Sequence, residues 1–152
     1  MRGAMAILVC FAAGSISALF ISADAGSWYD ALQKPFFTPA PWTFPFILIA
    51  MYALMACALA SMWMNDPHPH DFRGWVPLFF AHLLPSMAWT ILFFGFHVTF
   101  ISLLDLLVVT AAVFLLFMEA WEARRFAAYF LIPYLAWLFF MLVVNLSIWY
   151  LN

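Results

Sequence analysis

Long uninterrupted apolar runs constrain this chain more than any other feature of its sequence. Five of them have the roughly 20 residues that an α-helix needs to cross the hydrocarbon core of a bilayer. They do not alternate polar and apolar side chains as the strands of a transmembrane barrel do. We therefore predict a membrane-spanning helix for each run, because a helix satisfies its own backbone hydrogen bonds. The runs are residues 4–21, 45–64, 75–94, 98–118 and 126–150.

The composition agrees with a chain that lies mostly in lipid. Of its 152 residues, 69% are hydrophobic and 8% are charged, and the mean hydropathy is +1.06. A soluble domain carries roughly a quarter charged residues, because its surface faces water. The formal net charge of −2 offers no cationic surface for a phosphate backbone, so no nucleic-acid partner is predicted. The prediction is an all-α bundle of five transmembrane helices that forms a single domain over residues 1–152.

The few basic residues predict how the bundle is oriented. Lys34 falls on one side of the membrane, and the other basic residues fall on the side of the N-terminus. The positive-inside rule then predicts a cytoplasmic N-terminus and a C-terminus on the opposite side. The residues on the N-terminal side are Arg2, Arg73, Arg124 and Arg125.

The first run also has features of a signal peptide. It follows Arg2 and precedes Ala23-Asp24-Ala25, which fits an A-x-A cleavage site. The run is longer than the usual apolar region of a signal. We therefore predict a retained first helix rather than a cleaved signal.

The segment between the first two runs is rich in proline and aromatic residues. Each proline fixes its own φ and pushes the preceding residue away from helical conformation, so the segment is predicted to be extended and stiff. Its aromatic side chains could form a belt at the level of the lipid headgroups. Alternatively, the segment could be a lid that covers one mouth of the bundle and closes a pocket. The prolines are Pro35, Pro39, Pro41 and Pro45.

Two further prolines lie inside or near the start of apolar runs. Pro85 and Pro133 each remove a backbone donor and can kink a helix, which leaves room for a cavity. Trp89 and Trp137 each follow four residues after one of these prolines, on the same helical face. We predict that both indoles line that cavity, where aromatic walls suit a flat apolar ligand.

Four blocks of residues carry a resemblance to a known family. In chain order they are Trp28-Tyr29-x-x-Leu32-x-Lys34-Pro35 with Pro39 and Trp42, then Trp89 with Phe93-Phe94-Gly95-x-His97, then Asp105, then Pro133-Tyr134-Leu135-x-Trp137 with Asn145. Their order and spacing resemble the tryptophan-rich sensory protein or translocator protein family (TspO/MBR), also called the peripheral-type benzodiazepine receptor family. The blocks cover nearly the whole chain from Trp28 onward.

The resemblance implies a five-helix bundle, often a homodimer, that binds flat hydrophobic ligands in the membrane. Ligands associated with the family are tetrapyrroles such as protoporphyrin IX and haem, sterols, and synthetic isoquinoline or benzodiazepine compounds. The implied role is that of a sensor, carrier or scavenger, with porphyrin or haem as a ligand and without an obligatory cofactor. The candidate ligand-binding residues are Tyr29, Pro39, Trp42, Leu48, Tyr52, Ser86, Trp89, Thr90, Asp105, Leu106, Trp137, Met141, Val144 and Asn145.

Three of these candidate ligand-binding positions depart from the family pattern. Leu48 stands where the family usually has Trp, and the light-dependent breakdown of protoporphyrin proposed for the family has been tied to that Trp. Ser86 replaces a usual Asn, and Met141 replaces a smaller residue, which would narrow the pocket. Binding of a flat hydrophobic ligand is therefore the main prediction, and no catalytic or metal-binding residues are predicted. A protoporphyrin-degrading enzyme and a lipid or sterol transporter are the alternatives, although the chain lacks the inverted repeats of an ordinary secondary transporter.

Each polar residue in or near the apolar runs could have either a structural or a functional role. A carboxylate at the position of Asp105, near the middle of the fourth run, costs at least about 2.5 kcal/mol. Asp105 is therefore expected to face the bundle interior. There it could form a hydrogen bond to another helix, or it could bind a ligand or a proton. His82 could bond to a neighbouring helix or ligate haem iron. Imidazole and carboxylate groups of Asp66, His68, His70 and Asp71 could ligate a metal, but a solvated loop is the favoured interpretation.

Overall fold

The computed structural model describes residues 12, 14, 15, 28–64 and 74–152. The helices within these ranges are α2 (Trp28–Ala31), α3 (Thr43–Met64), α4 (Trp75–Thr90), η1 (Ile91–Gly95), α5 (Thr99–Ala123) and α6 (Arg125–Leu151). Within the same ranges, four stretches are long and apolar enough to cross a membrane. They are Thr43–Met62, Trp75–Gly95, Thr99–Ala123 and Arg125–Leu151. These findings confirm an all-α, multi-pass membrane fold.

Some predictions fall on parts of the chain that lie outside the described residues. They include the first run at residues 4–21, apart from helical residues 12, 14 and 15, and the signal-peptide alternative. The loop histidines, His68 and His70, and the basic residues Arg2 and Arg73 also lie outside them.

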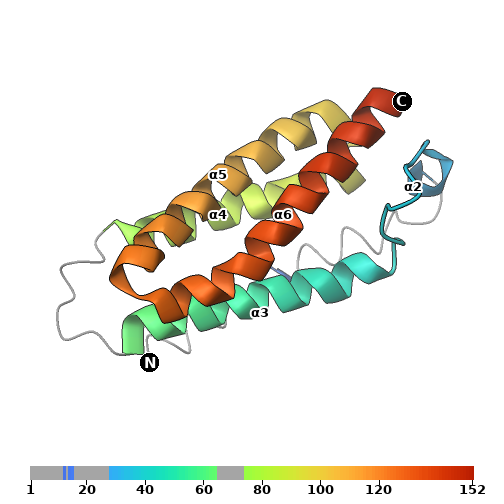
Figure 1. Ribbon diagram of the computed structural model, residues 1–152. Coiled ribbons are helices and arrows are strands. Elements are labelled where there is room, and N and C mark those ends of the chain that lie inside the picture. The colour runs from blue at the N-terminus through green and yellow to red at the C-terminus, as the bar shows by residue number, and fades with distance from the viewer. Residues whose placement is uncertain (1–11, 13, 16–27, 65–73) are drawn as a thin grey trace.

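The long helices pack side by side around α6. Helix α4 packs on α5, α5 packs on α6, and α6 packs on α3. Figure 1 shows α6 crossing the bundle between α3 and α5. Large apolar side chains on the outer helix faces remain exposed, and in a membrane they contact acyl chains rather than water. Examples are Leu107, Val108, Leu115 and Phe139.

Helix α4 does not end as a regular α-helix, which the sequence did not predict. It widens into the π-helical turn η1, in which the Phe96 N–H donates to Ile91 O (2.9 Å). The wider turn buries both Phe93 and Phe94. His97 follows with a φ of 60°, the left-handed conformation that commonly ends helices. The chain thus reverses direction in the short gap between the predicted runs at 75–94 and 98–118.

The predicted break at residues 119–125 is wrong in its extent. Helix α5 continues to Ala123 and α6 begins at Arg125, so Arg124 alone is extended, with a φ of −157° and a ψ of 91°. The segment contains no Gly or Pro, and its Glu, Ala and Arg residues have high helix propensity. Charged residues at the end of a membrane helix can remain helical while their side chains reach the interface.

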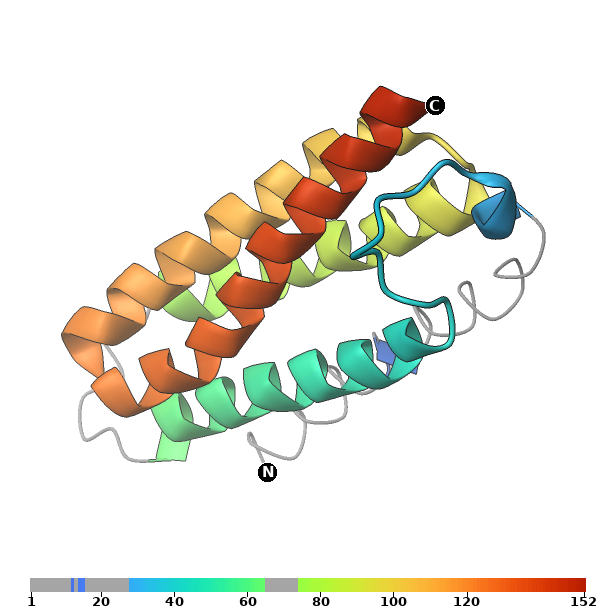
Figure 2. The ribbon, with the colours of Figure 1, turned by 45° about the vertical axis from the view of Figure 1, so that its right-hand side comes forward.

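Residues 28–42, which we call the lid, cross one end of the bundle. Figure 2 shows the lid running from α2 to α3 over the end at which η1 and the C-terminal part of α6 lie. At its far end, Thr43 begins α3, and its Oγ1 donates to Ala40 O (2.6 Å). Tyr29 of the lid is fully buried, whereas Trp42 is 70% exposed. The burial of Tyr29 supports the lid interpretation, whereas an aromatic belt at the headgroups stays a prediction.

Candidate ligand-binding cavity

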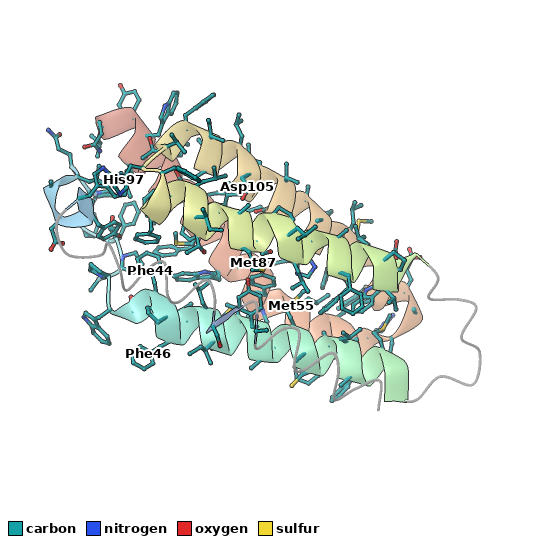
Figure 3. The ribbon with its side chains drawn as sticks, turned by 180° about the vertical axis from the view of Figure 1, so that it is seen from behind. Phe44, Phe46, Met55, Met87, His97 and Asp105 are labelled. Carbon is teal, nitrogen blue, oxygen red and sulfur yellow. The ribbon has the colours of Figure 1, made fainter. Side chains whose placement is uncertain are left out.

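Aromatic rings join the lid to the helices beneath it. The Tyr29 ring centroid lies 6.0 Å from that of Phe44, 6.2 Å from that of Phe93 and 5.6 Å from that of Phe94. Figure 3 shows Phe44 pointing into the bundle and Phe46 pointing away from it. The burial of Tyr29 among these rings fixes the lid over the helix ends, because aromatic side chains bury large apolar areas.

Polar contacts within the lid keep Tyr29 in place. Its hydroxyl donates to Pro39 O at 3.1 Å, across ten residues of the lid. The ammonium group of Lys34 donates to Tyr29 O, lies 4.2 Å from the centroid of the Tyr29 ring, and lies 3.6 Å from the Asp30 carboxylate. Burial raises the pKa of the Tyr29 hydroxyl, and the charge of Asp30 raises it further. Tyr29 is therefore a neutral donor at physiological pH.

Two further contacts attach the lid to the helices. The Trp28 ring stacks on the His97 ring with centroids 4.2 Å apart and planes inclined by 20°. Beyond α6, Asn152 forms a two-point hydrogen bond with the backbone of Gln33. The Gln33 N–H donates to Asn152 Oδ1 and Asn152 Nδ2 donates to Gln33 O, both at 3.0 Å. We call this pair the lid clamp.

A cavity of about 30 Å³ lies among α3, α4, α5 and α6. Phenylalanine rings connect it with the lid: Phe44 packs on both Tyr29 and Trp137, while Phe93 and Phe94 each pack on both Tyr29 and Trp89. Its walls are mainly apolar and aromatic, which is typical of sites for hydrophobic small molecules. The lining residues are Leu48, Met51, Tyr52, Ser86, Trp89, Leu106, Val109, Tyr134, Trp137, Leu138 and Met141.

Many of the predicted ligand-binding residues meet at this cavity. The structure brings together Leu48, Tyr52, Ser86, Trp89, Leu106, Trp137 and Met141. The sequence did not predict the other lining residues, although each lies three residues from a predicted one on the same helix. That spacing places side chains on one helical face and could have indicated them. They are Met51, Val109, Tyr134 and Leu138.

The side-chain amide of Asn145 joins three helices beside the cavity. In the orientation that gives both amide atoms a partner, its oxygen accepts from Trp89 Nε1 at 3.0 Å and from Ser102 Oγ at 3.2 Å. Its nitrogen donates to Thr99 O at 3.0 Å. Asn145 on α6 therefore links α4 through Trp89 and α5 through Thr99 and Ser102.

A sequence profile described as the TspO/MBR family matches residues 6–151 of this chain. The chain belongs to the TspO/MBR family. The tryptophan-rich protein TspO of Archaeoglobus fulgidus is 32% identical over 96% of this chain and 94% of its own length. The translocator protein of Homo sapiens is 29% identical over 93% of this chain and 82% of its own length. Protein CrtK of Rhodobacter capsulatus is 28% identical over 98% of this chain and 91% of its own length.

Other candidate ligand-binding residues of this TspO/MBR chain do not line the cavity. Tyr29 and Pro39 bond to each other within the lid, and Trp42 packs its exposed ring near Phe46 with centroids 6.3 Å apart. Direct ligand contacts of these residues stay predictions. The others outside the lining are Thr90, Asp105, Val144 and Asn145.

Two titratable residues of the TspO/MBR bundle also lie apart from the cavity lining. Figure 3 shows Asp105 on the side of α5 that faces α4. Its Oδ2 atom is buried and has no hydrogen-bond partner within the part of the chain that the structure describes. His82 is buried, and its Nδ1 is hydrogen-bonded to Phe79 O of its own helix rather than to a neighbouring helix.

The wall of the cavity has a close contact with Gly14. A Cβ atom added at Gly14 would lie 2.9 Å from Tyr52 Cδ2 and 3.4 Å from Tyr52 Cγ. Carbon atoms at 2.9 Å clash, so the absence of a side chain at Gly14 allows the Tyr52 ring to take its position in the wall.

Proposed function

We propose that this TspO/MBR protein binds a flat hydrophobic ligand of the tetrapyrrole class between the helices and the lid, and acts as a sensor, carrier or scavenger. The main support is the meeting of Trp89 and Trp137, from α4 and α6, at an apolar cavity. Indole faces pack favourably on the face of a planar conjugated ring. The aromatic contacts of Tyr29 would shield such a ligand from water.

The cavity must widen to hold a ligand of this size. Its volume is about 30 Å³, whereas small-molecule pockets usually enclose about 300–1,000 Å³. The unbranched side chains of Met51 and Met141 can change rotamer at low cost. Binding therefore requires movement of wall side chains together with the lid, and the protein described here represents a closed form.

Quenching of tryptophan fluorescence by protoporphyrin IX in detergent tests this proposal. We expect saturable quenching of the wild-type protein and a Kd raised about tenfold by Trp137→Ala, because a buried aromatic contact is removed. Trp149→Ala is the matched control, since Trp149 packs on Phe100 at the outer surface (centroids 5.2 Å apart). Saturation unchanged in both Trp137→Ala and Trp89→Ala would exclude this cavity as the site.

The alternatives predict different observations with the same probe. Light-dependent loss of porphyrin absorbance that requires the protein would favour the degrading enzyme. Leu48 occupies the cavity wall at the position where the family usually has Trp, so binding without degradation is the expected result. Protein-dependent flux of porphyrin or sterol across proteoliposomes would instead favour the transporter.

A further inference from the structure

We infer that Asn145 is a positioning residue, which holds the indole of Trp89 in the cavity wall without itself contacting the ligand. This inference rests on the proposed ligand-binding function of the cavity. It gives Asn145 a role different from the direct contact expected at first, and it makes one amide responsible for the orientation of an aromatic wall.

The first support is the placement of the Asn145 amide. Asn145 is fully buried and is not among the residues that line the cavity, whereas Trp89 lines it. The 3.0 Å distance from Trp89 Nε1 to the amide oxygen is that of a good N–H···O bond. In a buried site, an indole N–H without a partner is costly, so this bond favours one orientation of the ring.

The second support is the packing of Trp89 itself. One face of the indole stacks on Phe93, with centroids 5.5 Å apart and planes inclined by 16°. Phe94 packs edge-on at 6.1 Å and 89°. Stacking restricts the plane of the indole, and the bond from Nε1 to Asn145 restricts where the N–H edge of the ring points. These phenylalanines leave part of the indole surface uncovered. A planar ligand in the cavity would contact that part.

The amide is itself held in place from a third helix. Its nitrogen donates to Thr99 O and its oxygen also accepts from Ser102 Oγ, both in the first turn of α5. A side chain fixed at both ends of its amide orients its partner better than a freely rotating one. The position of the Trp89 ring is thus fixed by groups on α5 and α6, although Trp89 itself belongs to α4.

A double-mutant cycle with protoporphyrin IX separates positioning from general support of the bundle. We expect Asn145→Leu to raise the Kd about tenfold, the order of effect of one lost buried hydrogen bond. In a Trp89→Phe background, which has no indole N–H, Asn145→Leu should change the Kd less than about twofold. Additive effects of the two substitutions would overturn the inference, because they would show that Asn145 acts independently of Trp89.

A ligand-free measurement tests the bond directly. The indole ¹⁵N–¹H resonance of Trp89, assigned with Trp89→Phe, should move and exchange faster with solvent in Asn145→Leu. Asn145→Asp keeps an acceptor oxygen for the Trp89 N–H but loses the amide donor to Thr99 O, so its resonance and its affinity should lie closer to those of the wild type than to those of Asn145→Leu. Ser147→Leu, on the same helix, is the matched control, since the exposed Ser147 hydroxyl donates to Val143 O of its own helix.

The porphyrin titration and the resonance measurement test the proposed function and the role of Asn145 separately. If the wild-type protein does not bind protoporphyrin IX, the proposed function is wrong, while the resonance still reports on the bond. If the Trp89 resonance is unchanged in Asn145→Leu, the positioning of Trp89 by Asn145 is wrong even where porphyrin binds. A resonance in Asn145→Asp that matches Asn145→Leu would also contradict the inference.

Discussion

At the scale of single residues, Gly14 controls the shape of the cavity without contributing a side chain to it. We expect Gly14→Ala to push the Tyr52 ring inward, since the added Cβ would lie 2.9 Å from Tyr52 Cδ2. Overpacking of this kind costs about 1–3 kcal/mol of folding stability, and the narrowed cavity should raise the Kd for protoporphyrin IX at least about fivefold. Fluorescence titration measures the effect, and thermal unfolding in detergent reports the accompanying loss of stability.

Ala12 provides the control for Gly14. Ala12 is exposed two residues earlier, so Ala12→Val adds bulk without meeting Tyr52. The control should bind like the wild type. A Gly14→Ala protein with wild-type affinity would mean that the Tyr52 ring does not limit the ligand site.

Ionisation of the Tyr29 hydroxyl should weaken the closed lid at alkaline pH. The fold raises its pKa above the ordinary value of 10.0, through burial first and the nearby Asp30 second. The hydrogen bond to Pro39 O therefore stabilises the closed lid fully below pH 10 and is lost as the pH rises through the higher folded value. In a titration of phenolate absorbance, Tyr29→Phe should remove a component that ionises above pH 10. Loss of a component at the ordinary tyrosine pKa would contradict this.

At the scale of elements, the lid depends on a few identifiable attachments. Asn152→Ala removes both hydrogen bonds of the lid clamp and leaves the Gln33 N–H without its acceptor. A net loss of about 0.5–1.5 kcal/mol for each of the two bonds, or about 1–3 kcal/mol together, should raise amide exchange in the lid between about 5-fold and 150-fold. Hydrogen exchange of the lid peptide, followed by mass spectrometry, measures this change.

The matched variant for the clamp is Asn152→Asp. It keeps an acceptor for the Gln33 N–H and loses the donor to Gln33 O, so its exchange rate should fall between those of the wild type and Asn152→Ala. Equal lid exchange in all three proteins would show that the aromatic contacts of Tyr29 alone hold the lid closed.

At the scale of the whole molecule, the two ends of the bundle carry different groups. The lid with Lys34 covers one end, whereas Arg124 and Arg125 mark the junction of α5 and α6 at the other, as Figure 1 shows. From this difference the positive-inside rule predicts that the lid lies outside the cytoplasm. The homodimer implied by the family resemblance stays a prediction at this scale.

Thiol labelling in a bacterial expression host tests the orientation. Cysteines are placed at exposed positions, Phe36→Cys in the lid and Glu122→Cys near the other end, after replacement of Cys10 and Cys57 by Ala. A membrane-impermeant maleimide should label Phe36→Cys in intact cells and Glu122→Cys after lysis. The reverse pattern would place the lid in the cytoplasm.

The apolar runs predicted the positions of the transmembrane helices but not the details of their ends. The described transmembrane helices begin and end close to the predicted runs, since about 20 apolar residues must be helical to lie in lipid. The π-helical turn η1 and the extension of α5 to Ala123 were not indicated. Both depend on backbone hydrogen bonds and packing at a helix end, where an apolar run carries little information about the last turn.

The sequence by itself determined that the chain crosses the membrane as helices, that prolines restrict the backbone between the first two runs, and that Trp89 and Trp137 share a cavity. These follow from hydrophobic length, fixed proline dihedral angles and helical spacing, which are all local properties. The tertiary structure alone decided the partners of single side chains: Asn145 with Trp89, Gln33 with Asn152, and Gly14 with Tyr52. Such contacts join residues far apart in the chain, and they depend on how the helices pack against one another.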